Sequence, residues 1–201
     1  NILVTGSTGF IGRFAVAFLE SSGHKITALV RDIDRGKNLL GQDVRILGPN
    51  ITDMQLVHEL DKSHAVINLS GSAIATRWTN KKKEELKKSR VDVTQRLVKC
   101  LNLCKSPPKV FVSASAVGFY SNSGDSELTE ESHKGKGFLS DLCEEWEGEA
   151  IKAESKGVRV CRLRMGIVLG REGGVLKTMA LPFQMNLGGY FGGKQFVPWI
   201  H

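Results

Sequence analysis

The sequence is constrained most by three glycines near its beginning, which recur at every third position: Gly6, Gly9 and Gly12. An apolar run over residues 2–4 precedes them and is typical of a buried strand. Apolar residues then recur at helical spacing, at Ile11, Phe14, Ala15 and Phe18. This order of features predicts a strand, a tight glycine turn and a helix.

Glycines spaced in this way suit one kind of ligand. The first permits the tight turn, the second lets a pyrophosphate approach the backbone, and the third lets the helix pack against the strand. Unpaired amides at the start of the helix then face the phosphates. A kinase-type phosphate loop is excluded, because Arg13 follows Gly12 and the triplet Gly-Lys-Ser/Thr does not occur. We therefore predict a dinucleotide-binding turn formed by Gly6, Thr8, Gly9, Phe10, Ile11 and Gly12. A glycine turn without a ligand is the alternative.

The composition is that of a globular protein with one large domain, or one domain and part of another. The chain has 201 residues, of which 41% are apolar and 24% charged. No apolar run reaches the ~18 residues that a membrane span needs, so no membrane partner is expected. Both ends look cut, because Asn1 already lies in a predicted strand and His201 in an apolar run. We expect the protein in the cytoplasm or in an organellar stroma or matrix.

Two further composition features exclude other functions. The four cysteines form no C-x-x-C pair, so we interpret them as reduced thiols and predict no metal site. Much of the net charge of +7 comes from the lysine-rich segment 81–90, which also carries two glutamates. That pattern is typical of the solvated start of a long helix. The segment contains no aromatic residue on which a base would stack, so no nucleic-acid partner is expected.

Strand-like and helix-like segments alternate along the chain. We predict strands at 1–5, 25–30, 44–48, 64–69, 109–113 and 158–164, and helices at 10–22, 53–61, 80–104 and 138–155. This alternation predicts an α/β fold with a doubly wound parallel sheet, as in Rossmann-type NAD(P)-binding domains. Residues 1–165 would form that domain. Residues 166–201 are glycine-rich and would form the loop-rich start of a substrate-binding part.

The residues after the second predicted strand indicate which dinucleotide is preferred. An acidic residue there accepts hydrogen bonds from the ribose of NAD, whereas an arginine accommodates the 2′-phosphate of NADP. Arg31 comes first and Arg35 lies four residues further on, so both guanidinium groups suit a phosphate. We predict NADP, and Asp32 keeps NAD as the alternative.

Two further segments are expected at the same site. Leu69, Ser70 and Gly71 end the fourth predicted strand, where small residues let a nucleotide ribose lie close. Asn50 and Ile51 follow the third predicted strand, where side chains reach the adenine edge. Each segment is a weak signal alone, but together they occur in the order that a dinucleotide fold requires.

Several of these motifs together resemble the extended or atypical short-chain dehydrogenase/reductases. They are the glycine turn, Val30-Arg31-Asp32, the segment 68–71 and the segment 113–120, which reads Ser-Ala-Ser-Ala-Val-Gly-Phe-Tyr. Within that superfamily the chain is most similar to the NAD-dependent epimerase/dehydratase-like "epimerase family". The carboxyl segments 166–174 and 199–201 strengthen the resemblance, which covers essentially the whole chain. It implies NAD(P)-dependent chemistry on a small-molecule substrate.

The resemblance breaks at the catalytic dyad. The superfamily uses a tyrosine whose phenol is acidified by a lysine four residues later on one helix, with a serine that holds the substrate oxygen. In the matching helix, neither Phe138 with Leu142 nor Leu139 with Cys143 can move a proton. The string from Tyr190 to Lys194 has the right spacing, but we predict that it lies in a glycine-rich loop and reject it.

The remaining candidates for catalysis are few. Ser113 and Ser115 stand at the end of the fifth predicted strand, as expected for the superfamily serine. Tyr120 is the one phenol near the expected nicotinamide, and a packed tyrosine is the alternative interpretation. Glutamates at 144, 145, 147 and 149 are expected to form a solvated helix face.

Three functions are compatible with these features to different degrees. The first is an NADP(H)-dependent oxidoreductase or epimerase with an unusual proton donor. The second is a non-catalytic protein whose conformation or partners respond to NADP. A methyltransferase is disfavoured, because its cofactor has no pyrophosphate for the glycine turn. The sequence does not identify the substrate, and it leaves assembly into a homodimer as one possibility.

Overall fold

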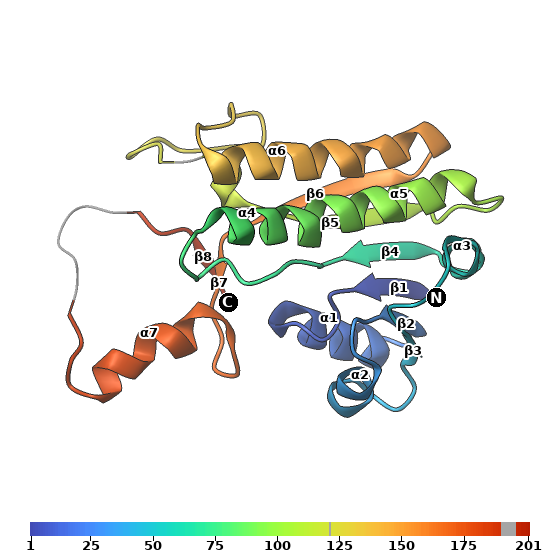
Figure 1. Ribbon diagram of the computed structural model, residues 1–201, viewed down its shortest axis with the longest axis horizontal. Coiled ribbons are helices and arrows are strands. Elements are labelled where there is room, and N and C mark those ends of the chain that lie inside the picture. The colour runs from blue at the N-terminus through green and yellow to red at the C-terminus, as the bar shows by residue number, and fades with distance from the viewer. Residues whose placement is uncertain (121, 190–195) are drawn as a thin grey trace.

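The computed structural model contains one parallel sheet of six strands with helices on both faces (Figure 1). It describes residues 1–120, 122–189 and 196–201. The strands are β1 (Ile2–Thr5), β2 (Ile26–Leu29), β3 (Arg45–Leu47), β4 (Ala65–Asn68), β5 (Val110–Ala116) and β6 (Arg159–Met165). Their order in the sheet is β3-β2-β1-β4-β5-β6, which is the Rossmann order. The predicted fold class is confirmed.

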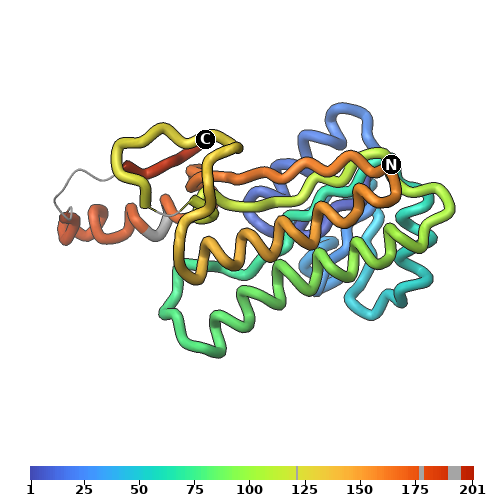
Figure 2. The backbone as a smooth tube through the Cα atoms, turned by 90° about the horizontal axis from the view of Figure 1, so that it is seen from above, coloured from blue at the N-terminus to red at the C-terminus, as the bar shows by residue number. Residues whose placement is uncertain are grey.

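The helices follow the predicted alternation. They are α1 (Phe10–Ser21), α2 (Ile33–Leu39), α3 (Asp53–Asp61), α4 (Asn80–Lys87), α5 (Val93–Leu103), α6 (Phe138–Ile151) and α7 (Gly174–Gln184). The short helical segments are η1 (Lys88–Asp92), η2 (Val117–Phe119) and η3 (Lys152–Lys156). Seen from above in Figure 2, α5 and α6 run side by side. None of the helices in the described ranges is long and apolar enough to cross a membrane.

Burial on both faces explains why the strands are apolar throughout. In β1, Leu3 packs into a cluster formed with α3, α5 and β5, whereas its neighbours Ile2 and Val4 pack into a second cluster formed with α1 and β2. Successive side chains of a strand point to opposite faces, so a sheet covered on both sides needs an unbroken apolar run.

The strand order fixes where a ligand can bind. β1 lies between β2 and β4, and the chain reverses its direction of winding there. In such sheets ligands bind beyond the carboxyl ends of the strands at this reversal. Thr5 at the end of β1 pairs in register with Leu29 of β2 and Asn68 of β4, so the loops that follow all three strands meet at one edge.

The structure differs from the predicted elements in three places. The helix expected at 80–104 is interrupted by η1, a π-helical segment, between α4 and α5. Helix α2 was not predicted, because it is short and polar with Gly36 at its centre, and it begins where Asp32 caps it. Finally, the glycine-rich region contains helix α7 and two paired strands, β7 (Ile167–Val168) and β8 (Trp199–Ile200), where we expected loops.

Glycine at position 12 is required by close packing, which a matched pair of substitutions can test. A Cβ added at Gly12 in α1 would lie 2.2 Å from the Gly6 carbonyl oxygen, whereas at Gly148 in α6 it would meet nothing within 4 Å. We expect Gly12→Ala to lower the free energy of unfolding by about 1–3 kcal/mol, as overpacking does. Gly148→Ala should raise it by roughly 0.5–1 kcal/mol, because alanine is the better helix former. Urea denaturation measures both values, and equal effects would contradict the packing argument.

Candidate functional site

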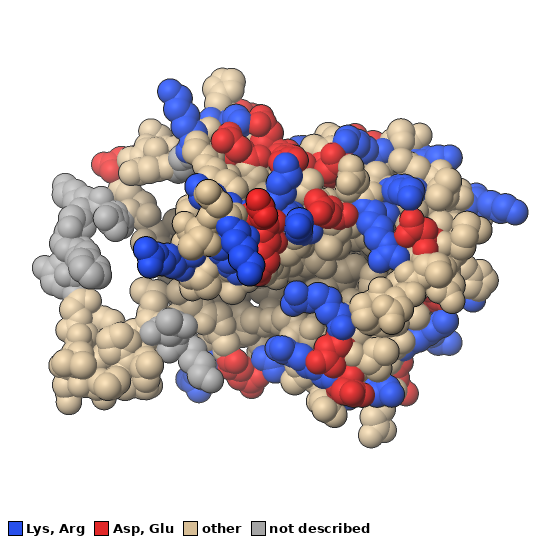
Figure 3. Space-filling model, in the orientation of Figure 1, with Lys and Arg blue, Asp and Glu red and all other residues tan. Residues whose placement is uncertain are grey.

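A cavity of about 560 Å³ lies at the carboxyl ends of β1, β2 and β4. Figure 3 shows Lys and Arg side chains above and below the hollow in the middle of this face. Nine residues predicted to bind a cofactor line the cavity: Gly6, Thr8, Gly9, Arg31, Asp32, Arg35, Leu69, Ser70 and Gly71. The structure therefore brings together three segments that are far apart in the sequence.

The glycine turn presents backbone amides to this cavity. Gly6 has a positive φ of 70°, and its carbonyl accepts a hydrogen bond from the Gly9 amide at 3.0 Å. Gly9 is the N-cap of α1, and no side chain caps this helix end. The first turn of α1 carries no acidic residue either. An uncapped helix N-terminus with a positive dipole end attracts an anion, so the turn fits the phosphates of a dinucleotide.

The segment after β2 places two cations at the cavity edge. The Asp32 carboxylate accepts a hydrogen bond from the Arg35 backbone amide at 2.9 Å and so caps α2. This cap fixes Arg35 in the first turn of α2, with Arg31 just before the helix. Within the described part of the chain, neither guanidinium makes a hydrogen bond or an ion pair. Both are exposed, and both suit a phosphate.

The segment after β4 forms the opposite wall, and a buried polar network holds it in place. The Thr5 hydroxyl donates to the Asn68 side chain at 2.7 Å, and the Ser70 hydroxyl donates to Thr5 at 2.8 Å. The Asn68 amide donates to Thr94 of α5 at 2.8 Å. The network ties the ends of β1 and β4 to α5, so the wall beside the glycine turn is built in advance of any ligand.

Five residues predicted to bind the cofactor do not line this cavity. Ile11 and Gly12 lie within α1, and the Phe10 ring packs against glycines 170, 173 and 174. Pro49 lines the cavity, whereas Asn50 and Ile51 border a separate cavity of about 650 Å³. Their contact with a cofactor stays a prediction.

Other residues line the cavity that the sequence analysis missed. They come from η1 and α5 and include Ser89, Val93, Arg96 and Leu97. The Arg96 guanidinium donates to the Asp53 carboxylate at 2.9 Å and to the Ile51 carbonyl. The hydrogen bonds that Asp53 accepts from Arg96 and Lys99 lower its pKa below the usual range. The lysines before this segment suggested only a solvated helix, so no sequence signal pointed to a ligand-facing side.

The candidate catalytic residues lie at the carboxyl end of β5, with Ser113 and Ser115 in the strand and Tyr120 at the end of η2, and a second network joins Ser115 to Tyr120. Ser115 and Tyr120 are both buried, and the Ser115 hydroxyl donates to the Glu147 carboxylate at 2.5 Å. Arg164 of β6 donates to both Glu147 oxygens at 2.8 Å and to the Tyr120 hydroxyl at 2.7 Å. One carboxylate therefore orients the serine directly and the tyrosine through a guanidinium. Ser113 is also buried, with its hydroxyl 3.3 Å from the Ala114 carbonyl.

The expectation for Glu147 was wrong. We expected it on a solvated helix face, but its side chain is 4% exposed and paired with Arg164. Its neighbours in the predicted face, Glu144 and Glu145, do form surface ion pairs with Lys134 and Lys87. The helical period that puts 144 and 145 outward turns 147 toward β5 and β6, where two arginines of an edge strand compensate its charge.

Electrostatics keep Glu147 ionised. Burial alone would raise its pKa, but the hydrogen bonds from Arg164 and Ser115, together with the charges of Arg164 and Arg162, outweigh burial and lower the pKa. The pKa of Arg164 is raised in turn, chiefly by its hydrogen bond to Glu147. The Arg164 guanidinium also lies 3.6 Å from the centre of the Phe119 ring. The ion pair with Glu147 therefore holds the Arg164 cation in a fixed position beside the Tyr120 phenol.

The matching helix α6 carries no tyrosine–lysine dyad. Leu142 and Cys143 are buried core residues of α6. The string from Tyr190 to Lys194 lies outside the described residues.

The sequence and the fold are similar to those of known proteins. The profile of the NAD dependent epimerase/dehydratase family matches residues 2–201. The chain belongs to this family. It is 41% identical over 208 residues to the Arabidopsis thaliana "Epimerase family protein SDR39U1 homolog, chloroplastic", covering 100% of this chain and 58% of that protein. It is 34% identical to "Epimerase family protein YfhF" of Bacillus subtilis, covering 100% of this chain and 66% of that protein.

Solved structures agree with this assignment. The chain is similar to the crystal structure of human epimerase family protein SDR39U1 with NADPH, with 34% identity and a TM-score of 0.79. That comparison covers 100% of this chain and 65% of the human one. A Bacillus cereus UDP-glucuronic acid 4-epimerase in complex with UDP-glucuronic acid and NAD shares the fold, with 18% identity and a TM-score of 0.70, covering 87% of this chain and 59% of that one. The chain thus spans about three fifths to two thirds of these relatives.

Removing the Glu147 charge should destabilise the protein in a pH-dependent way. Glu147→Gln leaves the partly buried Arg164 guanidinium without its carboxylate; breaking a fully buried pair costs about 3–5 kcal/mol, which is the upper bound expected here. Because the pKa of Glu147 is lowered on folding, its stabilisation is complete above the unfolded pKa and is lost as the pH falls through the folded pKa. Denaturation of both proteins between pH 7 and 3 should show a gap in unfolding free energy that narrows with acid. Glu144→Gln, on the surface, is the control and should change little.

Proposed function

We propose that this protein is an NADP(H)-dependent oxidoreductase or epimerase acting on a small polar substrate. The observation that carries the proposal is the cavity itself. It joins an uncapped, glycine-lined helix N-terminus to two exposed arginines whose guanidinium groups form no ion pair in the described chain. The relative solved with NADPH, at 34% identity, supports the same cofactor.

The cofactor's groups fit the residues that line the cavity. Backbone amides of the glycine turn would bind the diphosphate, and Arg31 with Arg35 would bind the 2′-phosphate. Leu69, Ser70 and Gly71 would bound the ribose. The bound nicotinamide supplies hydride transfer. Asp32 already caps α2 through one oxygen, which favours the arginines as the residues that select the cofactor.

Proton chemistry at the substrate is assigned to the second network. Ser115 would hold the substrate oxygen, and the Tyr120 phenol would move the proton beside the Arg164 cation. Arg164 would stand where the superfamily has its lysine, because it is the cation within hydrogen-bond distance of this phenol. Glu147 is a positioning residue, since its carboxylate holds both Ser115 and Arg164. Ser113 is the alternative to Ser115.

One relative suggests which substrate class to test first. One fold relative carries UDP-glucuronic acid in its structure, which makes sugar nucleotides the first class to test. The name of the Arabidopsis relative supports an organellar stroma, and the cytoplasm is the other compartment that we propose. The alternative function, a non-catalytic NADP-responsive protein, predicts cofactor binding without turnover of any substrate.

Cofactor preference tests the two arginines. We expect Arg31→Gln with Arg35→Gln to weaken NADPH binding about tenfold or more, because two cations facing a phosphate are lost, and to leave NADH binding nearly unchanged. Fluorescence titration of both cofactors measures this ratio. Arg159→Gln, at the opposite end of the sheet on β6, removes a charge far from the cavity and is the control. An unchanged NADPH affinity in the double variant would refute the assignment.

Turnover tests the second network. Once a sugar-nucleotide or carbonyl substrate is found, Tyr120→Phe should lower kcat by roughly 10²–10⁴-fold, the usual contribution of a positioned acid or base. Ser115→Ala should also lower kcat, and both variants should bind NADPH as the wild type does. Ser106→Ala, on the surface, is the control. Full kcat in both variants would mean that Ser115 and Tyr120 are packing residues.

A further inference from the structure

One buried cation has no role in the sites described so far. Arg90 is buried, with only 8% of the residue exposed. Its guanidinium donates to the Ser72 carbonyl at 3.0 Å and to the Leu86 carbonyl at 3.3 Å, with the Trp146 ring centre 5.5 Å away. Across residues 1–120, 122–189 and 196–201, no carboxylate pairs with it. A charge buried without a counter-charge is costly and uncommon in folded proteins.

The position of Arg90 connects it to the cavity. It lies in the π-helical segment η1, together with Ser89, which lines the cavity. Such π-helical segments frequently occur at functional sites. A Cβ added at Gly71 would lie 3.1 Å from the Arg90 guanidinium, and Gly71 also lines the cavity. The cation therefore stands directly behind the wall that follows β4.

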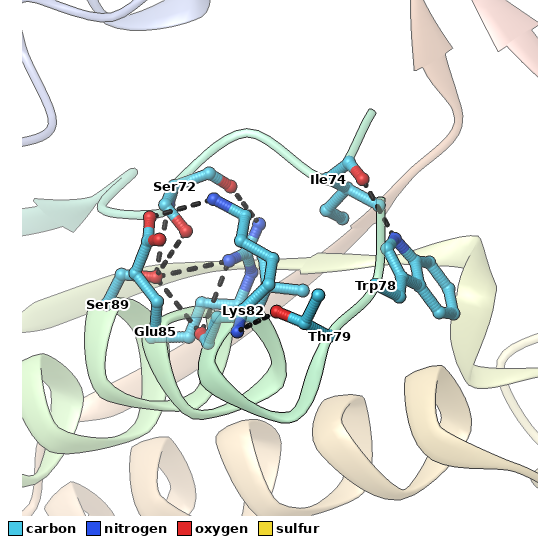
Figure 4. A network of polar contacts seen from close by, with 9 residues as sticks. Ser72, Ile74, Trp78, Thr79, Lys82, Glu85 and Ser89 are labelled. Atoms are coloured by element: carbon cyan, nitrogen blue, oxygen red, sulfur yellow. Dashed lines mark hydrogen bonds and ion pairs between the residues drawn. The ribbon is translucent and has the colours of Figure 1, made fainter. Parts of the chain in front are cut away.

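Hydrogen bonds across this wall join the same segments. The Ser89 hydroxyl lies 3.2 Å from the Ser72 hydroxyl and accepts from the Ser72 amide at 3.1 Å (Figure 4). Arg90 adds a further hydrogen bond between these two segments, to the Ser72 carbonyl. A neutral donor would serve that structural purpose without a desolvated charge, whose burial lowers the pKa of Arg90. An arginine nonetheless stays protonated in proteins, so the charge persists behind the wall.

The topology indicates which phosphate is near. The wall after β4 borders the glycine turn, since a Cβ on Gly6 would lie 2.3 Å from the Leu69 carbonyl oxygen. Arg31 follows β2, on the other side of β1. We infer that the Arg90 guanidinium is a fixed charge of the nucleotide cavity whose counter-ion is the diphosphate of the bound dinucleotide. The inference rests on the proposed function, and it assigns the 2′-phosphate to other residues.

Two ligands separate the diphosphate from the 2′-phosphate. ADP-ribose carries the diphosphate alone, and adenosine 2′-monophosphate carries the 2′-phosphate alone. We expect Arg90→Gln and Arg90→Met to weaken ADP-ribose binding about tenfold. Both variants should change adenosine 2′-monophosphate binding less than twofold. Arg90→Lys keeps the charge and should bind close to the wild type. Isothermal titration at low and high salt measures these affinities, and because Arg90 is buried the loss should persist at high salt.

The controls distinguish a charge from a structural support. Arg159→Gln should leave both affinities unchanged. Wild-type ADP-ribose affinity in Arg90→Gln, with a loss only in Arg90→Met, would show that hydrogen bonding matters and would overturn the inference. Equal affinity in all variants would overturn it as well, with the proposed function intact. A wild-type protein that binds neither ADP-ribose nor NADPH would overturn both. Thermal denaturation without ligand checks that each variant is folded. If Arg90→Met does not fold, the comparison of Arg90→Lys with Arg90→Gln decides the test.

Discussion

The contact between the glycine turn and the end of β4 is the constraint on which the rest of the site depends. A Cβ on Gly6 would lie 2.3 Å from the Leu69 carbonyl oxygen, and one on Gly12 would lie 2.2 Å from the Gly6 carbonyl oxygen. These two close backbone contacts bring α1, β1 and β4 together at the point where the chain reverses its direction of winding through the sheet. They leave the α1 amides open toward the cavity, because the N-cap is a glycine without a side chain to occupy them. The requirement for close packing and the capacity to bind an anion therefore have the same origin.

The sheet could be predicted from the sequence because its cause is local. Strands buried on both faces must be apolar throughout, and the turn after β1 needs a positive φ at Gly6, which glycine adopts readily. The cavity-lining residues in that turn and after β2 and β4 could be predicted for the same reason, since each segment directly follows a strand end. Helix α2 was missed because its signal is a single cap, the Asp32 carboxylate, which we interpreted only as a ribose ligand. Helix α7 was missed because its many neighbouring glycines suggested loops.

Glu147 and Arg90 could not be predicted, because their environment comes from distant segments. Glu147 looks like any surface glutamate of a polar helix, and its burial depends on Arg164 arriving from an edge strand. Arg90 belongs to a lysine-rich run, and only the π-helical register of η1 turns it inward beneath Gly71. In a helix of uniform period, sequence spacing predicts which residues face solvent. One widened π-helical turn shifts that spacing, so the predicted exposure of Arg90 no longer holds.

These two buried charges differ in a way that distinguishes a structural role from a ligand-dependent one. Glu147 is compensated within the fold, by a guanidinium that bonds both of its oxygens and by a second arginine nearby. Its network is complete in the free protein, so it fixes geometry. The Arg90 guanidinium donates hydrogen bonds to carbonyl and hydroxyl groups and lies over the Trp146 ring, and in the described part of the chain no carboxylate pairs with it. The diphosphate of a bound dinucleotide would supply the negative charge that the fold lacks near Arg90. Burying Arg90 would then be less costly in the bound protein than in the free protein, which favours the bound state.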